Sequence, residues 1–152
     1  MRLLGLVLVA GALSACASGS VDPSRDAEAK LFRAPADKAC IYVVPTTTIP
    51  AVTVTMDGRK VGTLEAENYF RLDVSPGRHV LSVAPPNLMP FLFRETRDGV
   101  GVDTEAGRCY FLRTVWTEDP QRLRQFRVFL ERVAETEGQR EVNVRMLTLP
   151  GN

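Results

Sequence analysis

Few residues of this chain are of the types that carry chemistry. The candidates are three cysteines (Cys16, Cys40 and Cys109) and the single histidine, His79. A thiolate can act as a nucleophile or a metal ligand, and an imidazole can move protons near neutral pH. Cys40, His79 and Cys109 are far apart in the sequence and lack the paired spacing of structural zinc ligands. We therefore predict no metal site.

The sequence also lacks a recognisable catalytic set. Beyond the N-terminal region the only serines are Ser75 and Ser82, and neither lies in a Gly-x-Ser-x-Gly nucleophile elbow. Asp57 is explained by a predicted turn, and we expect His79 at the end of the core, bonded to a backbone carbonyl near the Pro76-Gly77 turn. No pair of carboxylates stands out as an acid/base couple. We therefore predict a non-enzymatic protein that needs no dissociable cofactor.

Cys16 lies at the end of a typical export signal. Arg2 precedes an apolar run over residues 3–13. That run is shorter than the about 20 residues of a membrane-spanning helix and fits the roughly 7–15 residues of a signal peptide. Leu13-Ser14-Ala15-Cys16 then resembles the lipobox of bacterial lipoproteins, an apolar residue and two small residues before a cysteine.

The resemblance implies a signal peptide over residues 1–15, cleaved between Ala15 and Cys16. It also implies that Cys16 carries diacylglycerol on its sulfur and an acyl group on its amine. Because Ala17 rather than Asp follows, it implies the periplasmic face of an outer membrane. Two alternatives are an ordinary secretory signal cut at an Ala-x-Ala-like site and a buried apolar strand with a chance cysteine.

Residues 16–36 are small and polar, so we expect the lipidated cysteine to be followed by a flexible tether. The 19 basic and 18 acidic residues of the chain nearly cancel, and no Lys/Arg run occurs. This balance excludes nucleic acid as the main partner. The expected partners are the membrane, through the lipid anchor, and an envelope protein. The sequence does not indicate a small-molecule ligand.

Residues 37–150 form the predicted domain, in which short apolar or alternating runs are separated by turn residues. Asp57-Gly58 suits a type I′ hairpin turn, and Pro76-Gly77 suits a type II turn. The run at 40–44 is apolar on both faces, which is typical of a central strand. The predicted strands cover residues 40–44, 51–56, 59–64, 69–74, 79–84, 91–96, 99–105, 109–116 and 125–132.

This rhythm predicts an all-β fold, a sandwich of two antiparallel sheets of the immunoglobulin or prealbumin type. Residues 135–149 fit either a short helix or a further strand. If they form a helix, the fold has one short helix at its C-terminal end.

The order of the motifs is similar to domain-of-unknown-function family 2846, a family of small bacterial lipoproteins. The similarity covers residues 39–116 and rests on Ala39-Cys40-Ile41-Tyr42-Val43, Val54-x-x-Asp57-Gly58-x-x-Val61-Gly62-x-Leu64, Asn68-Tyr69-Phe70, Pro76-Gly77-x-His79-x-Leu81-x-Val83 and Gly107-x-x-Tyr110-Phe111-Leu112-Arg113. It implies an envelope lipoprotein with a prealbumin-like sandwich and no assigned biochemistry.

Cys40 and Cys109 form an even pair in a compartment that permits disulfides, each opening a strand that could face the other across the core. Both a disulfide and two buried free thiols fit this pattern.

For function, we expect binding or scaffolding at the envelope. Leu88, Met89, Phe91, Phe93 and Trp116 are the candidate binding surface, unless Phe91 and Phe93 alternate into the core. The alternative is a module that binds peptidoglycan or another glycan, with Trp116 and the three tyrosines stacking on sugar rings.

Overall fold

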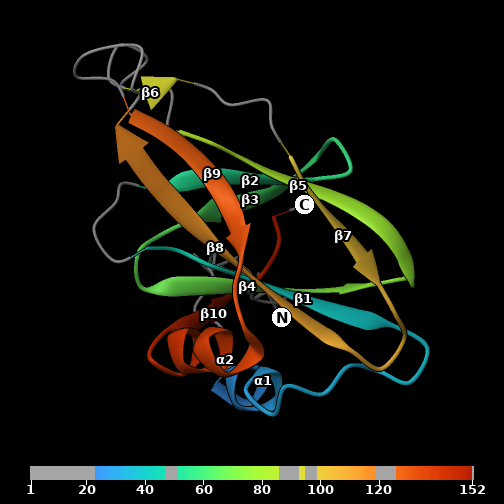
Figure 1. Cartoon of the computed structure of the whole chain (residues 1–152). Coiled ribbons are helices and arrows are strands. Elements are labelled where there is room, and N and C mark those ends of the chain that lie inside the picture. Colours follow the sequence, from blue (N-terminus) through green and yellow to red (C-terminus); the bar gives the residue numbers. More distant parts are fainter. Residues whose placement is uncertain (1–22, 47–50, 86–92, 95–98, 119–125, 152) are drawn as a thin grey trace, which may run out of the picture.

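The computed structural model describes residues 23–46, 51–85, 93–94, 99–118 and 126–151. Two β-sheets pack face to face, and two short helices cover the outer face of the larger sheet (Figure 1). The predicted two-sheet, mostly β architecture is confirmed.

The larger sheet has six strands in the order β10-β4-β1-β8-β9-β6. Their bounds are β1 Ala39–Val44, β4 Asn68–Val74, β6 Phe93–Arg94, β8 Cys109–Glu118, β9 Phe126–Arg132 and β10 Met146–Thr148. β1 pairs antiparallel with β4, and β8 pairs antiparallel with β9. Three other pairs, β1 with β8, β4 with β10 and β6 with β9, are parallel. The prediction of purely antiparallel sheets is therefore wrong for this sheet, because strands that are distant in the chain meet in it side by side.

The smaller sheet is wholly antiparallel in the described residues, with the order β3-β2-β5-β7. Its strands are β2 Val52–Met56, β3 Arg59–Leu64, β5 Gly77–Ala84 and β7 Val100–Thr104. Asp57 and Gly58 connect β2 to β3 with φ of 51° and 77°. Both values are positive, as the predicted type I′ turn requires.

The core between the sheets is built by the alternation that the sequence predicts. Val52 and Val54 of β2 are buried, and so are Phe70, Leu72 and Val74 of β4. Ala39, Ile41 and Val43 of β1 also face this core. Because side chains alternate along a strand, the other three residues of β1 face the other side of the sheet.

That outer face carries a second apolar cluster under the helices α1 (Pro23–Ala29) and α2 (Glu135–Asn143). Cys40, Tyr42 and Val44 of β1 belong to it and are fully buried. Burial on both faces confirms β1 as a central strand. The helix α2 and strand β10 settle the ambiguous C-terminal region, which contains one of each.

Helix α1 corrects the predicted domain boundary. It lies inside the expected flexible tether, yet Ala29 is only 2% exposed and belongs to the outer cluster. The Asp26 carboxylate accepts hydrogen bonds from the Tyr69 hydroxyl and the Leu147 backbone N–H, both at 2.9 Å. The folded domain thus begins at or before Pro23, and residues 23–36 are part of it.

Candidate functional site: a groove beside the disulfide

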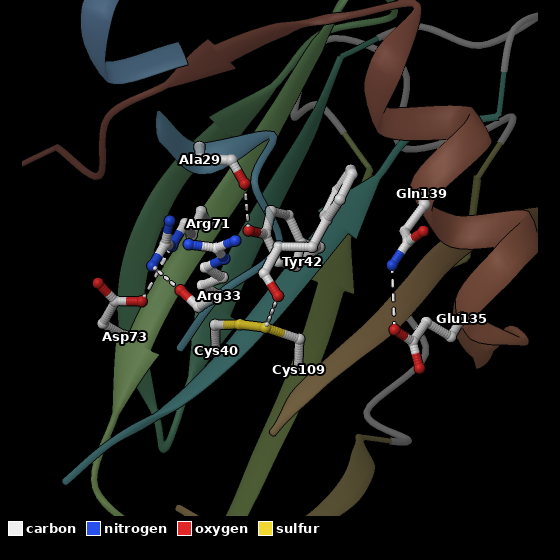
Figure 2. Close-up of a disulfide and its surroundings, with 10 residues drawn as sticks. Ala29, Arg33, Cys40, Tyr42, Arg71, Asp73, Cys109, Glu135 and Gln139 are labelled. Atoms are coloured by element: carbon white, nitrogen blue, oxygen red, sulfur yellow. Dashed lines mark hydrogen bonds and ion pairs between the residues drawn. A yellow bond between two sulfur atoms is a disulfide. The ribbon is translucent and has the colours of Figure 1, made fainter. Parts of the chain in front are cut away.

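Cys40 and Cys109 form a disulfide within the six-stranded sheet. Cys40 and Cys109 are direct partners in the parallel register of β1 and β8, with their Cα atoms 4.5 Å apart. The sequence suggested that their strands could face each other across the core, but they are neighbours in one sheet. Cys40 is fully buried, whereas Cys109 is partly exposed (Figure 2).

Next to Cys109 is an open groove of about 580 Å³. Its apolar side is formed by Phe32, Tyr110, Phe111 and Val133, and its polar side by Asp103, Glu105, Arg108, Arg132 and Glu135. These residues come from three parts of the chain: the segment after α1, the stretch from the end of β7 to the start of β8, and the stretch from the end of β9 to the start of α2. The lining of the groove thus combines ring faces with charges of both signs.

Hydrogen bonds and ring contacts fix the groove wall. The Tyr110 hydroxyl accepts a hydrogen bond from the Glu105 backbone N–H at 3.0 Å. The Arg132 guanidinium lies 5.0 Å from the centre of the Tyr110 ring, within cation–π range. On the surface, Arg108 pairs with Glu105 at 3.0 Å. The groove therefore offers a tyrosine ring with Arg132 over it, beside charged side chains of both signs.

Phe32 closes the groove toward α1. Its φ of 54° is in the left-handed region, which bulky residues rarely adopt. This turn places its ring 5.5 Å from that of Tyr42 and 5.9 Å from that of Phe111. Under α1, the Tyr42 hydroxyl donates to the Ala29 carbonyl oxygen at 2.5 Å (Figure 2). Burial raises the pKa of Tyr42 to about 12, so it stays a donor at neutral pH.

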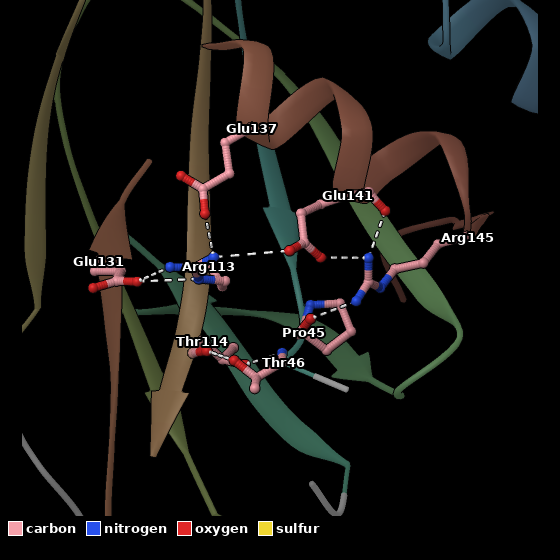
Figure 3. Close-up of polar contacts among 8 residues, drawn as sticks. All are labelled: Pro45, Thr46, Arg113, Thr114, Glu131, Glu137, Glu141 and Arg145. Carbon is pink, nitrogen blue, oxygen red and sulfur yellow. Dashed lines mark hydrogen bonds and ion pairs between the residues drawn. The ribbon is translucent and has the colours of Figure 1, made fainter. Parts of the chain in front are cut away.

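A charged network holds α2 against the sheet. Arg113 of β8 bonds Glu131 of β9 at 2.5 Å and Glu137 of α2 at 2.6 Å, with Glu141 at 3.7 Å (Figure 3). The hydrogen bond to Glu131 is the largest cause that raises the pKa of Arg113, and the bond to Glu137 adds to it.

Arg145 anchors the far end of α2. Its side chain is almost fully buried, and its guanidinium donates to Glu141 at 2.7 Å and to the Pro45 carbonyl at 3.0 Å (Figure 3). Because these groups all saturate one another, the network is structural rather than a vacant binding site.

His79 is also fully engaged. Its Nδ1 lies 2.7 Å from the Asp57 carboxylate and its Nε2 lies 2.8 Å from the Ser75 carbonyl oxygen. The Ser75 contact is of the kind that the sequence suggested. The hydrogen bond with Asp57 raises the pKa of His79 and lowers that of Asp57. With both ring nitrogens bonded, the imidazole has none free to take a proton from a ligand.

Most of the predicted binding surface lies outside the described residues. This holds for Leu88, Met89 and Phe91, and Phe93 is described only by its backbone in β6. Trp116 is partly buried and packs against the core between the sheets.

The proposed stacking aromatics are also mostly internal, since Tyr42 and Tyr69 are fully buried. Tyr110 remains partly exposed, in the groove wall.

In the described part of the chain, no three His, Cys, Asp or Glu side chains are grouped so that they could bind a metal ion. Neither α1 nor α2 has the length and apolar character to cross a bilayer.

Among family models and curated proteins, no match to this chain was found. The similarity to family 2846 therefore stays a prediction.

Sequence reasoning missed Asp26, Arg145 and the groove. For Asp26 a signal existed: Pro23 suits the first turn of a helix, and Asp26 and Lys30 have the i, i+4 spacing of a helical ion pair. For the groove no local signal existed, because its wall joins three segments that are distant in the sequence.

Proposed function

We propose that this chain is the precursor of a lipid-anchored protein of the bacterial cell envelope, whose folded domain acts by binding rather than catalysis. The observation that carries the proposal is Leu13-Ser14-Ala15-Cys16 directly after an apolar run. Cleavage before Cys16 would leave every described residue in the mature protein, because the described domain begins at Pro23.

The acylated cysteine would be a durable anchor. Each buried methylene contributes about 0.8 kcal/mol, so one acyl chain binds marginally whereas two or three hold a protein on a bilayer. Ala17 favours the outer membrane over the inner one. The disulfide between Cys40 and Cys109 supports an oxidising compartment such as the periplasm.

We favour binding over catalysis because three side chains that could take part in acid/base chemistry or hold a substrate are already bonded to other groups of the protein. His79 has both ring nitrogens bonded, and Arg113 and Arg145 are held by carboxylates. The groove around Tyr110 and Arg132 is the proposed contact surface for an envelope protein.

The second candidate function is that of a glycan-binding module. The observation that favours it is the partly exposed Tyr110 ring, flanked by Arg132 and by the acidic groove residues. A tyrosine ring can stack on a sugar ring, and charges of both signs beside it suit a polymer such as peptidoglycan, which carries both acidic and amino groups. Binding to purified sacculi, lost in a Tyr110→Ala variant, would support this candidate over a protein partner.

The anchor is tested by expressing the full chain in a Gram-negative host with labelled palmitate. The wild type should incorporate label and fractionate with the outer membrane, whereas Cys16→Ser should do neither. Ala17→Asp is the matched variant, because it keeps the thiol: it should stay labelled but move to the inner membrane. Label and membrane association retained by Cys16→Ser would overturn the proposal.

A further inference from the structure

Three exposed apolar residues are carried by two segments that a hydrogen bond joins. The large apolar residues that are exposed in the described part of the chain are Leu31, Val80, Val144, Met146 and Leu149. Three of them are sequence neighbours of Lys30 or Arg145, which are joined by the 2.7 Å hydrogen bond from Lys30 Nζ to the Arg145 carbonyl oxygen. Leu31 follows Lys30 in the chain, and Val144 and Met146 flank Arg145. We call Leu31, Val144 and Met146 the apolar patch.

The structure turns these side chains outward. Arg145 points into the protein, where its guanidinium reaches the Pro45 carbonyl, and its side chain is 3% exposed. Its neighbours Val144 and Met146 are correspondingly 76% and 49% exposed. Leu31, just after α1, is 59% exposed. None of these side chains contributes to either apolar cluster, so the fold does not require them to be apolar.

The backbone that carries the patch is held in place by α1. Asp26 of α1 bonds both Lys30, at 2.7 Å, and the Leu147 backbone N–H of β10, at 2.9 Å. Together with the hydrogen bond from Lys30 to the Arg145 carbonyl oxygen, these bonds fasten α1 to β10 and to the turn before it. The two segments that carry the three apolar side chains are therefore fixed relative to each other.

The position of the patch relative to Cys16 indicates what covers it. Six residues, 17–22, separate Cys16 from Pro23. The chain therefore makes seven steps from Cys16 to Pro23. At about 3.5 Å per step, the Cα atoms of these two residues lie at most about 25 Å apart. Helix α1 adds only about 10 Å at 1.5 Å per residue. An anchor at Cys16 would thus hold the α1 end of the domain near the lipid, with the smaller sheet on the far side of the larger one (Figure 1).

We infer that the apolar patch is the surface on which the domain rests against the phospholipid bilayer. This inference depends on the proposed lipid anchor. Exposed charges on the neighbouring segments are mixed in sign, so the apolar side chains rather than net charge carry the contact; these charges include Arg25, Glu28, Arg33, Glu67 and Arg140. Tethering raises the local concentration of the surface, and therefore even a weak contact fixes the orientation of the domain.

The test compares two exposed residues of nearly equal exposure. Met146→Cys lies in the patch, and Val80→Cys, on β5 of the other sheet, is the control (49% and 45% exposed). Each mature, acylated protein is labelled with an environment-sensitive fluorophore and reconstituted into vesicles of phosphatidylethanolamine and phosphatidylglycerol. Val144→Cys is a second patch position, so that the result does not depend on one variant.

The label at positions 146 and 144 should shift to the blue. Nitroxide groups on the lipid chains should also quench it at least about twofold more than the label at position 80. Equal quenching at all three positions would overturn the inference. So would a shielded label at 146 that lipid nitroxides do not quench, since a protein surface would then cover the patch.

Mass spectrometry of the intact reconstituted protein separates this test from that of the anchor. Acyl chains on Cys16 together with water-exposed labels at 144 and 146 would refute the resting surface alone. A protein without acyl chains would refute the proposed function and the inference with it.

Discussion

Asp26 and Tyr69, 43 residues apart in the chain, are joined by a hydrogen bond of 2.9 Å beneath α1. Tyr69 is fully buried and Asp26 is 8% exposed. Although burial opposes ionisation, the bonds from Lys30, the Leu147 N–H and Tyr69 hold the pKa of Asp26 below its ordinary 3.8. This carboxylate thus connects α1 to two neighbouring strands of the larger sheet, β4 through Tyr69 and β10 through Leu147.

Asp26→Ala should lower the free energy of unfolding by about 3 kcal/mol, because a buried hydroxyl and a buried backbone N–H lose their acceptor. Urea denaturation measures the loss. Asp26→Asn keeps an oxygen acceptor and should cost less. Since the folded pKa is depressed, the contribution of Asp26 is present above pH 4 and lost as pH falls through that folded pKa. The Asp26→Ala variant should lack this part of the acid dependence. Equal stability of both variants and the wild type would refute the role of Asp26.

The disulfide predicts a second stability difference. Cys40 and Cys109 are 69 residues apart, and closing a loop of that length stabilises by at most about 4 kcal/mol in the chain-entropy model. The double variant Cys40→Ala/Cys109→Ala should approach that loss in urea denaturation. A reducing agent should destabilise the wild type in the same way and leave the double variant unchanged. An effect of the reducing agent on the variant would contradict this interpretation.

His79 predicts a pH dependence with the opposite sign. The Ser75 carbonyl can only accept, so Nε2 donates to it, and Nδ1 meets the Asp57 carboxylate best when it is also protonated. The folded pKa of His79 is therefore raised above its ordinary 6.5. The contribution is fully present below pH 6.5 and is lost as pH rises through the folded pKa. Because Asp57 is 45% exposed, the contribution should be about 1 kcal/mol or less.

Since His79 is the only histidine, its ring proton NMR signals titrate without overlap from others. Asp57→Asn should return the pKa of His79 toward 6.5 and still suit the type I′ turn. An unchanged pKa in Asp57→Asn would exclude the carboxylate as the cause.

Arg113→Met should destabilise the protein by about 2 kcal/mol, because Glu131 and Glu137 would lose their hydrogen bonds to the guanidinium and face each other without a counter-charge. Glu141 would keep its ion pair with Arg145. Thermal or urea unfolding measures this loss. The control is Arg78→Met, which breaks a 3.4 Å pair with Asp103 in which both side chains are largely exposed. That change should cost less than about 0.5 kcal/mol. Similar effects of the two variants would show that the Arg113 network does not hold α2.

The sequence was informative where structure is local and uninformative where it is not. Alternation and the Asp57-Gly58 turn predicted β2 and β3 almost residue by residue. The pairing of β1 with β8 could not be predicted, because nothing within a strand specifies a parallel neighbour 69 residues away. Helix α1 was missed because its small and polar residues resemble a tether; it is stabilised by the sheet beneath it, through Ala29 and Asp26. The groove depends on that same distant packing.

Gly138 of α2 provides the sharpest test of how closely the helix approaches the sheet. Alanine favours a helix over glycine by about 1 kcal/mol, so on propensity alone Gly138→Ala should stabilise the protein. A Cβ there would lie 2.3 Å from Cγ and 2.4 Å from Cβ of Phe111 in β8, and the Phe111 Cβ is fixed by the strand backbone. We therefore expect Gly138→Ala to destabilise the protein by about 2 kcal/mol.

The matched control is Thr136→Ala in the same helix, at an exposed position, which should change stability by less than about 0.5 kcal/mol. Because the clash involves Cγ and Cδ1 of Phe111 as well as its Cβ, Phe111→Ala, which removes two of these three atoms, should reduce the cost of Gly138→Ala. A double-mutant cycle in urea would measure this coupling, which should exceed about 0.5 kcal/mol for residues in contact. A stabilising Gly138→Ala, or additive effects in the cycle, would mean that α2 stands further from β8 than the structure places it.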